Sequence, residues 1–170
     1  MLAAGLSACL YVFGAIQSFL LREPPYADAD RLVHVELTSE RAADNGVEVR
    51  LRDFATLEQM QTALEPIAAY YTGTVNLSGD RAGAERYDGA FVAAAAFEAL
   101  RAPALVGRTL TRDDEAAGAA PVVLLGWELW QQRYGGDPEV LGRAIRVNGR
   151  SATVVGVMPQ GFRFPMAEQV

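Results

Sequence analysis

Cysteine, histidine and lysine are scarce in this sequence, which has one cysteine, one histidine and no lysine among 170 residues. A single cysteine, Cys9, excludes an intrachain disulfide and a cysteine-based metal site. The single histidine, His34, has neither a second histidine nor an evident nucleophile near it in sequence, so we interpret it as a packing or surface residue. We therefore predict no catalytic, cofactor-binding or metal-ligating residue and no cofactor.

Two sequence motifs of enzymes are also missing. There is no Gly-x-x-x-x-Gly-Lys-Ser/Thr loop, so the chain cannot itself hold the phosphates of ATP. There is no Gly-x-Ser-x-Gly elbow either, and this argues against a hydrolase with a serine, histidine and aspartate triad. The chain is not expected to be an enzyme.

Positive charge is in deficit, because 15 basic residues, all of them arginine, stand against 21 acidic ones and give a net charge of −6. An acidic chain with its charges distributed along it is not expected to bind nucleic acid or anionic lipid through a basic face. The length past residue 21 suffices for one domain of ordinary size with its own core.

Charged side chains are absent from residues 1–21. As a helix this run would be about 31 Å long, against a hydrocarbon core of about 30 Å. We predict a transmembrane helix over residues 1–21, shortened at its amino-terminal side, and a stiff juxtamembrane exit over residues 22–30, where Pro24 and Pro25 restrict the backbone. The main domain, residues 31–170, would then lie outside the cytoplasm.

Other interpretations of residues 1–21 remain open at the sequence level. A secretory signal would carry basic residues before its apolar stretch and a small-residue cleavage site after it, and neither is present. The run Leu6-Ser7-Ala8-Cys9 is similar to a lipoprotein cleavage box, which would make the chain a membrane-anchored, lipoprotein-like periplasmic binding module. A buried core helix is the third interpretation.

Alternating and helical patterns predict an α+β domain. Arg31 to Leu37 alternates as a strand does, and Asp53 is placed to cap a helix. The apolar stripe of that helix is expected to face the core before Pro66 ends it, and it consists of Phe54, Leu57, Met60 and Leu64. Strand-like stretches follow at Ile67–Leu77, with Gly73 marking a turn or bulge, and at Tyr87–Val92 after a turn at Asp80–Gly83. A helix over Ala93–Leu100 would bury Phe97 and Leu100.

Three neighbouring carboxylates, Asp113, Asp114 and Glu115, suggest either a calcium site or a helix cap. The ligand spacing of a calcium loop is absent, and general acid/base catalysis needs carboxylates that converge across a cleft. Thr111 precedes Asp114 by three residues, which is typical of a capping arrangement with acids at the positive end of a helix. We therefore predict a cap here.

The last third of the chain has the clearest local pattern. Pro121–Leu125 is a short apolar run of strand length, and Trp127, Leu129, Trp130 and Tyr134 follow at helical spacing before Gly135-Gly136. The two tryptophans are expected to fill the core or a domain interface, and Asp137-Pro138 is typical of a helix start. Asn148-Gly149 between alternating stretches, residues 143–147 and 150–157, predicts a β-hairpin with a two-residue turn.

A series of runs in fixed order and spacing is distinctive. They are Gly107-Arg108-Thr109, Asp114, Pro121-Val122-Val123-Leu124, Trp130-Gln131-Gln132-Arg133-Tyr134-Gly135-Gly136-Asp137-Pro138, Gly142, Val147-Asn148-Gly149-Arg150, Val154-Val155-Gly156-Val157-Met158-Pro159 and Gly161-Phe162-Arg163-Phe164-Pro165. Together these runs resemble the extracytoplasmic core domain of MacB-type ABC transporter permeases. Upstream, Leu20-Leu21-Arg22, Pro25-Tyr26 and Asp30-Arg31-Leu32-Val33 are similar to the end of that family's first membrane helix and the strand that leaves it. Arg101 departs from the pattern, because the family usually has a glycine after the helix predicted at Ala93–Leu100.

The resemblance implies a function that the residues alone do not. It implies a bacterial permease that couples ATP hydrolysis in the cytoplasm to efflux or mechanical transmission across the inner membrane. The implied partners are a cytoplasmic ATPase subunit or domain, a second permease copy in a homodimer, a periplasmic adaptor and the lipid bilayer. Since the core domain stops before its usual second half, we expect an amino-terminal fragment or a truncated gene product that does not transport unaided.

Overall fold

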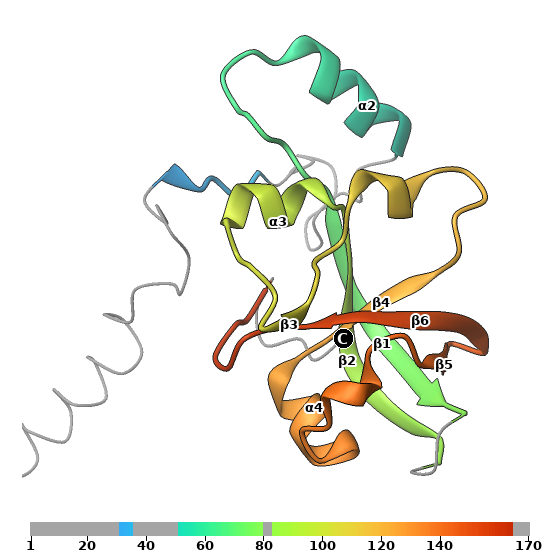
Figure 1. Ribbon diagram of the computed structural model, residues 1–170. Coiled ribbons are helices and arrows are strands. Elements are labelled where there is room, and N and C mark those ends of the chain that lie inside the picture. Colours follow the sequence, from blue (N-terminus) through green and yellow to red (C-terminus); the bar gives the residue numbers. More distant parts are fainter. Residues whose placement is uncertain (1–30, 36–50, 80–82, 165–170) are drawn as a thin grey trace, which may run out of the picture.

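The computed structural model describes residues 31–35, 51–79 and 83–164, and its elements are shown in Figure 1. The predicted membrane helix, the juxtamembrane exit and residues 80–82 of the predicted turn lie outside the described residues. Within the described part, no helix has the length and apolar character needed to cross a bilayer. The elements are α2 (Leu51–Met60), β1 (Tyr70–Ser78), β2 (Glu85–Val92), α3 (Ala95–Leu100), β3 (Val106–Gly107), the 3-10 turn η2 (Arg112–Glu115), β4 (Val122–Leu125), α4 (Trp127–Tyr134), the 3-10 turn η3 (Pro138–Val140), β5 (Ala144–Val147) and β6 (Arg150–Val157).

The fold is α+β, as predicted, and is built on a mixed sheet of six strands. The strand order is β2-β1-β5-β6-β3, and β4 also pairs with β6. The β4 and β6 strands run parallel, whereas the other pairs are antiparallel. Because β6 pairs with β3, β4 and β5, it is the central strand of the sheet.

The predicted carboxy-terminal hairpin is confirmed. Val147 pairs with Arg150, and the two residues between them, Asn148 and Gly149, have φ values of 51° and 80°. Positive φ at both central positions gives the turn a twist that matches the two strands, and asparagine followed by glycine accepts this backbone at low cost.

Gly107 and Gly156 face each other where β3 meets β6. A Cβ atom on Gly156 would overlap the carbonyl oxygen of Arg108, and one on Gly107, whose φ is 77°, would overlap the carbonyl oxygen of Val155. Two backbones therefore approach each other here more closely than any side chain would permit.

The core lies between the sheet and the α4–η3 segment. Its fully buried side chains are Leu77, Leu125, Leu129, Val140, Val154 and Val157. Trp130 is buried with them, Trp127 packs against them, and the Trp130 indole N–H donates to the Asp137 carbonyl oxygen at 2.9 Å. The prediction that both tryptophans fill the core is confirmed. The β4 strand, α4 and the η3 start at Asp137, whose side chain accepts from the Glu139 N–H, also form as predicted.

The helix predicted over residues 93–100 is present in a shorter form. The helix α3 begins at Ala95, two residues later than expected, and buries Phe97 and Leu100 as predicted. Arg101 ends it in the left-handed conformation, with a φ of 48° and its N–H bonded to the Glu98 carbonyl oxygen. Glycine adopts this conformation without strain, whereas a residue with a Cβ atom does not. Arg101, which stands where the resemblance leads one to expect a glycine, therefore makes this helix end less favourable.

The predictions for residues 31–66 need correction. Residues 32–35 are irregular and do not form the predicted strand, and residues 36 and 37 lie outside the described part. The helix α2 begins at Leu51, so Asp53 lies inside it and is not its cap, and it ends at Met60, before Leu64. Leu57 and Met60 are 38% and 77% exposed, so the apolar stripe does not face the core. Figure 1 shows the reason, because α2 lies apart from the sheet, beyond α3.

The first long strand also differs from its prediction. It starts at Tyr70, so residues 67–69 are not part of β1. Gly73 lies in the middle of β1, opposite Gly89, and the register runs unbroken from Tyr70 to Leu77. Gly73 is therefore neither a turn nor a bulge. The strand β2 extends two residues before the predicted start at Tyr87.

Candidate functional site

Three aromatic side chains connect the first described residues to the last. Tyr70, the first residue of β1, has its hydroxyl 3.0 Å from the Nε2 atom of His34, and the two rings stack with centroids 5.9 Å apart. Phe164 also contacts Tyr70, edge to face, with centroids 5.0 Å apart. We call these three residues the aromatic junction. It ties the segment that follows the predicted membrane helix to both β1 and the carboxy-terminal turn.

His34 has the role predicted for it. It is exposed and packs on Tyr70. The described residues contain no group of three histidine, cysteine or acidic side chains that could hold a metal ion. Tyr70 and Phe164 were not singled out from the sequence, because contacts between residues so far apart in the chain leave no local pattern.

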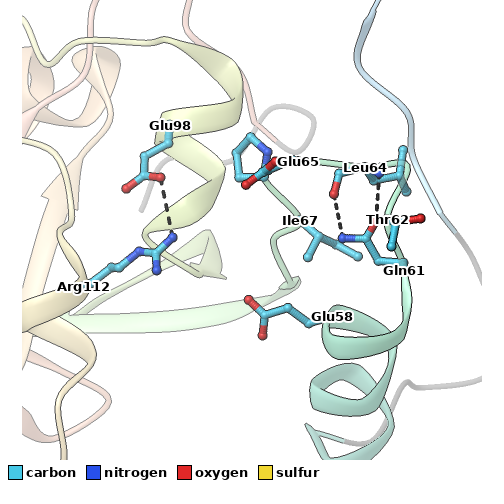
Figure 2. A pocket seen from close by; sticks show the side chains of 9 residues that line it. Glu58, Gln61, Thr62, Leu64, Glu65, Ile67, Glu98 and Arg112 are labelled. Atoms are coloured by element: carbon cyan, nitrogen blue, oxygen red, sulfur yellow. Dashed lines mark hydrogen bonds and ion pairs between the residues drawn. The ribbon is translucent and has the colours of Figure 1, made fainter.

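A polar recess of about 450 Å³ lies between α2, α3 and η2, and Figure 2 shows its lining. Gln61 stiffens one wall, because its side chain donates to the Leu64 carbonyl oxygen at 2.6 Å and accepts from the Leu64 N–H at 2.8 Å. Across the recess, Arg112 lies 3.8 Å from Glu98. Both of these side chains are more than half exposed, so their attraction is strongly screened by water.

The polar recess does not have the arrangement of an acid/base site. Its carboxylates, Glu58, Glu65 and Glu98, are all exposed, and Figure 2 shows them on separate segments without convergence on one point. General acid/base catalysis requires a carboxylate held at hydrogen-bond distance from the reacting atom. The recess is therefore a surface feature that could accept a partner rather than a reaction centre.

The predicted cap at Thr111 is confirmed. One Asp114 oxygen accepts hydrogen bonds from the Thr111 N–H at 2.8 Å and the Thr111 hydroxyl at 2.9 Å. Arg108 donates to both Asp114 oxygens, at 2.6 and 2.8 Å. This hydrogen-bonded guanidinium, together with the Thr111 donors, holds the pKa of Asp114 well below its ordinary value. The neighbouring Glu115 accepts from the Ala94 N–H at 2.7 Å. Asp114 therefore stabilises the cap of η2, whereas Glu115 connects η2 to the residue before α3.

A buried arginine joins α4 to the start of β2. The Arg133 side chain is only 1% exposed and lies 2.7 Å from a Glu85 carboxylate oxygen. It also donates to the Tyr87 hydroxyl at 3.2 Å and to the Gly83 carbonyl oxygen, and it lies over the Tyr87 ring. Burial raises the pKa of the Tyr87 phenol. The sequence places Arg133 on α4 but does not show that it would be buried, since its partners lie about 50 residues earlier.

These contacts hold the elements of the described part of the chain together. Comparison with known families shows to which family the chain belongs, because the model of the MacB-like periplasmic core domain matches residues 2–169. The chain belongs to this family. The resemblance inferred from the sequence is therefore confirmed for nearly the whole chain. This MacB-like domain is of a kind found in the permeases of ABC transporters, and it is not a classical enzyme domain.

Solved structures show the same fold. The extracellular domain of the ABC-type transporter YknZ from Gram-positive bacteria matches with a TM-score of 0.56 and 15% identity, over 65% of this chain and 57% of that one. The periplasmic region of MacB from Actinobacillus actinomycetemcomitans matches with a TM-score of 0.55 and 19% identity, over 65% of this chain and 50% of that one. The MacB-like domain thus spans about half of each of these two chains. Comparison with curated protein sequences gives no match.

Proposed function

We propose that this MacB-like domain transmits movement between a membrane helix and the extracytoplasmic side of an ABC transporter permease. In this role it couples ATP hydrolysis by a cytoplasmic ATPase to efflux or to mechanical work, and it catalyses no reaction itself. The proposed partners are that ATPase, a second permease copy, a periplasmic adaptor and the bilayer, which residues 1–21 would cross as a helix. The family assignment supports this proposal.

The aromatic junction is the observation that carries the mechanical part of the proposal. His34 lies thirteen residues after the end of the proposed membrane helix at Leu21, and its ring stacks on Tyr70. Tyr70 begins β1, which is paired with β2 over eight residues and with β5 near its other end. We expect a displacement of residues 31–35 to reach β1 through the contact of His34 with Tyr70, and to pass from β1 to the strands paired with it.

A matched pair of tyrosine variants tests this role. Tyr70→Ala removes the ring between His34 and Phe164, whereas Tyr71→Ala removes a ring that is 61% exposed and stacks on Phe91 instead. Each variant would be expressed as the full chain, together with the remaining permease segments and the ATPase. The measured quantities are ATPase co-purification and substrate export per ATP hydrolysed.

We expect Tyr70→Ala to keep the ATPase bound but to lower export per ATP several-fold, while Tyr71→Ala matches the wild type. Equal export per ATP in the two variants would refute the role of the junction. Membrane extraction with carbonate and mass spectrometry of the amino terminus test the anchor. An acylated Cys9 at a new amino terminus would instead support the lipoprotein-like binding module.

A further inference from the structure

A second hollow, larger than the polar recess, lies between β4, the β1–β2 pair and α3. Its volume is about 590 Å³, within the range of roughly 300–1,000 Å³ typical of small-molecule pockets. Apolar side chains make up most of its lining, among them Val92, Phe97, Leu110, Leu124 and Phe162. We call it the apolar cavity. Burial of an apolar ligand in this cavity would be favourable, because it removes apolar surface from water.

One arginine on the lining of the apolar cavity has an unmatched charge. Arg150, at the start of β6, is exposed, and its side chain takes part in no hydrogen bond or ion pair with the described residues. Two residues away in the hairpin turn, Asn148 also lines the cavity, and its Oδ1 atom accepts from the Asn76 N–H at 2.9 Å. The Asn148 amide nitrogen donates no hydrogen bond to the described residues. The hairpin end of the cavity therefore presents a guanidinium and an amide donor.

The acidic residues on the lining are already engaged. Asp114 accepts two hydrogen bonds from the Arg108 guanidinium, and Glu115 accepts from the Ala94 N–H beside α3. Their charges therefore lie with the η2 and α3 end of the cavity, whereas the unpaired cation lies at the hairpin end. A ligand that complements this distribution has an anionic head at Arg150 and an apolar body.

We propose that the apolar cavity binds a single-chain carboxylate amphiphile of the fatty-acid type. Its carboxylate takes the hydrogen bonds of the Arg150 guanidinium and the Asn148 amide, and its alkyl chain lies against Phe97, Leu124 and Phe162. Planar guanidinium and carboxylate groups match in geometry and form the stronger kind of hydrogen bond. This binding does not depend on the mechanical role proposed above.

Photo-crosslinking of the full chain in lipid nanodiscs tests the proposal. The probe is decanoate with a diazirine in its alkyl chain, and mass spectrometry of proteolytic peptides maps the labelled residues. Unlabelled octanoate, decanoate and decanol serve as competitors. We expect saturable labelling of the peptides that carry β4 and residues 158–164, with decanoate competing more than tenfold better than octanoate, because each buried methylene is worth about a factor of four in affinity.

Two charge variants separate specific binding from partition into the bilayer. Arg150→Gln should reduce labelling at least tenfold, whereas Arg146→Gln, the same change on the neighbouring strand β5 and outside the cavity lining, should leave it unchanged. Leu110→Trp, which fills the cavity without removing charge, should also reduce labelling while thermal unfolding stays cooperative. Labelling that is equal in the two arginine variants, competition by decanol as strong as by decanoate, or adducts outside the cavity would each overturn the proposal.

Discussion

At the residue scale, the charged side chains that matter most to this domain are those with fixed partners. Arg133 is nearly inaccessible to solvent, although its carboxylate partner Glu85 is half exposed. Removing one member of a buried pair leaves the other with an unbalanced charge, which costs more than the pair contributes. Arg133 therefore makes the attachment of α4 to β2 sensitive to single substitutions.

Glu85→Gln should lower the free energy of unfolding by about 1–3 kcal/mol, because the Arg133 guanidinium would stay buried without its carboxylate. Urea unfolding of the purified chain measures the change. The control is Glu98→Gln, which breaks the exposed 3.8 Å contact with Arg112 and should change stability by less than about 0.5 kcal/mol. Similar losses in the two variants would show that Arg133 is not held as described.

Asp114 gives the domain a predictable response to acid. Because its pKa is lower in the folded state than the unfolded value of about 3.9, its bonds to Arg108 and Thr111 contribute fully above about pH 5. This contribution is lost as the pH falls toward the folded-state pKa. Asp114→Asn should therefore cost about 1–2 kcal/mol at pH 7 and less at pH 3, as measured by urea unfolding. Asp113→Asn, one residue away, should leave this pH dependence as it is.

At the scale of elements, the ends of helices and the close contacts of strands carry the sharpest constraints. Arg101 terminates α3 with a left-handed backbone, which costs a residue with a Cβ roughly 1–2 kcal/mol. Arg101→Gly should raise the free energy of unfolding by about 1 kcal/mol, whereas Arg101→Ala, which keeps the Cβ, should bring no gain. Thermal unfolding followed by circular dichroism distinguishes the two, and an equal shift in both would contradict the backbone explanation.

The junction of β3 with β6 should tolerate no side chain at its glycines. Gly156→Ala forces a methyl group against the Arg108 carbonyl oxygen and should cost about 1–3 kcal/mol. Gly73→Ala is the matched control, because its new methyl group would meet no atom within 4 Å and alanine suits a strand better than glycine does. Urea unfolding should therefore show a loss for the first variant and a small gain for the second.

Elements whose partners lie nearby in the chain could be predicted from the sequence, and those defined by distant partners could not. The β5–β6 hairpin, α4 and the Thr111 cap depend on contacts over a few residues, so their patterns are complete in short windows. The exposed stripe of α2 shows the limit. Its spacing suits a core-facing helix, but spacing does not reveal whether any surface lies opposite it.

At the scale of the whole molecule, an α+β fold with a mixed sheet, packed helices and a carboxy-terminal hairpin could be predicted as a class, but its strand order could not. No local signal shows that β4 runs parallel to β6, or that Arg133 reaches back to Glu85. The site was likewise only partly predicted. The packing role of His34 could be predicted, whereas its contact with Tyr70, and the contact of Tyr70 with Phe164, depend on residues far apart in the chain and became visible only in three dimensions.

The central position of β6 also determines when this domain can assemble during its synthesis. Among the described residues, β3 and β4 have no pairing partner except β6, which ends at Val157. A nascent chain that has emerged only as far as α4 thus carries the apolar β4 strand with its backbone groups unpaired. If the chain crosses the membrane unfolded, this stretch would need protection by a chaperone until β6 has emerged and pairs with it.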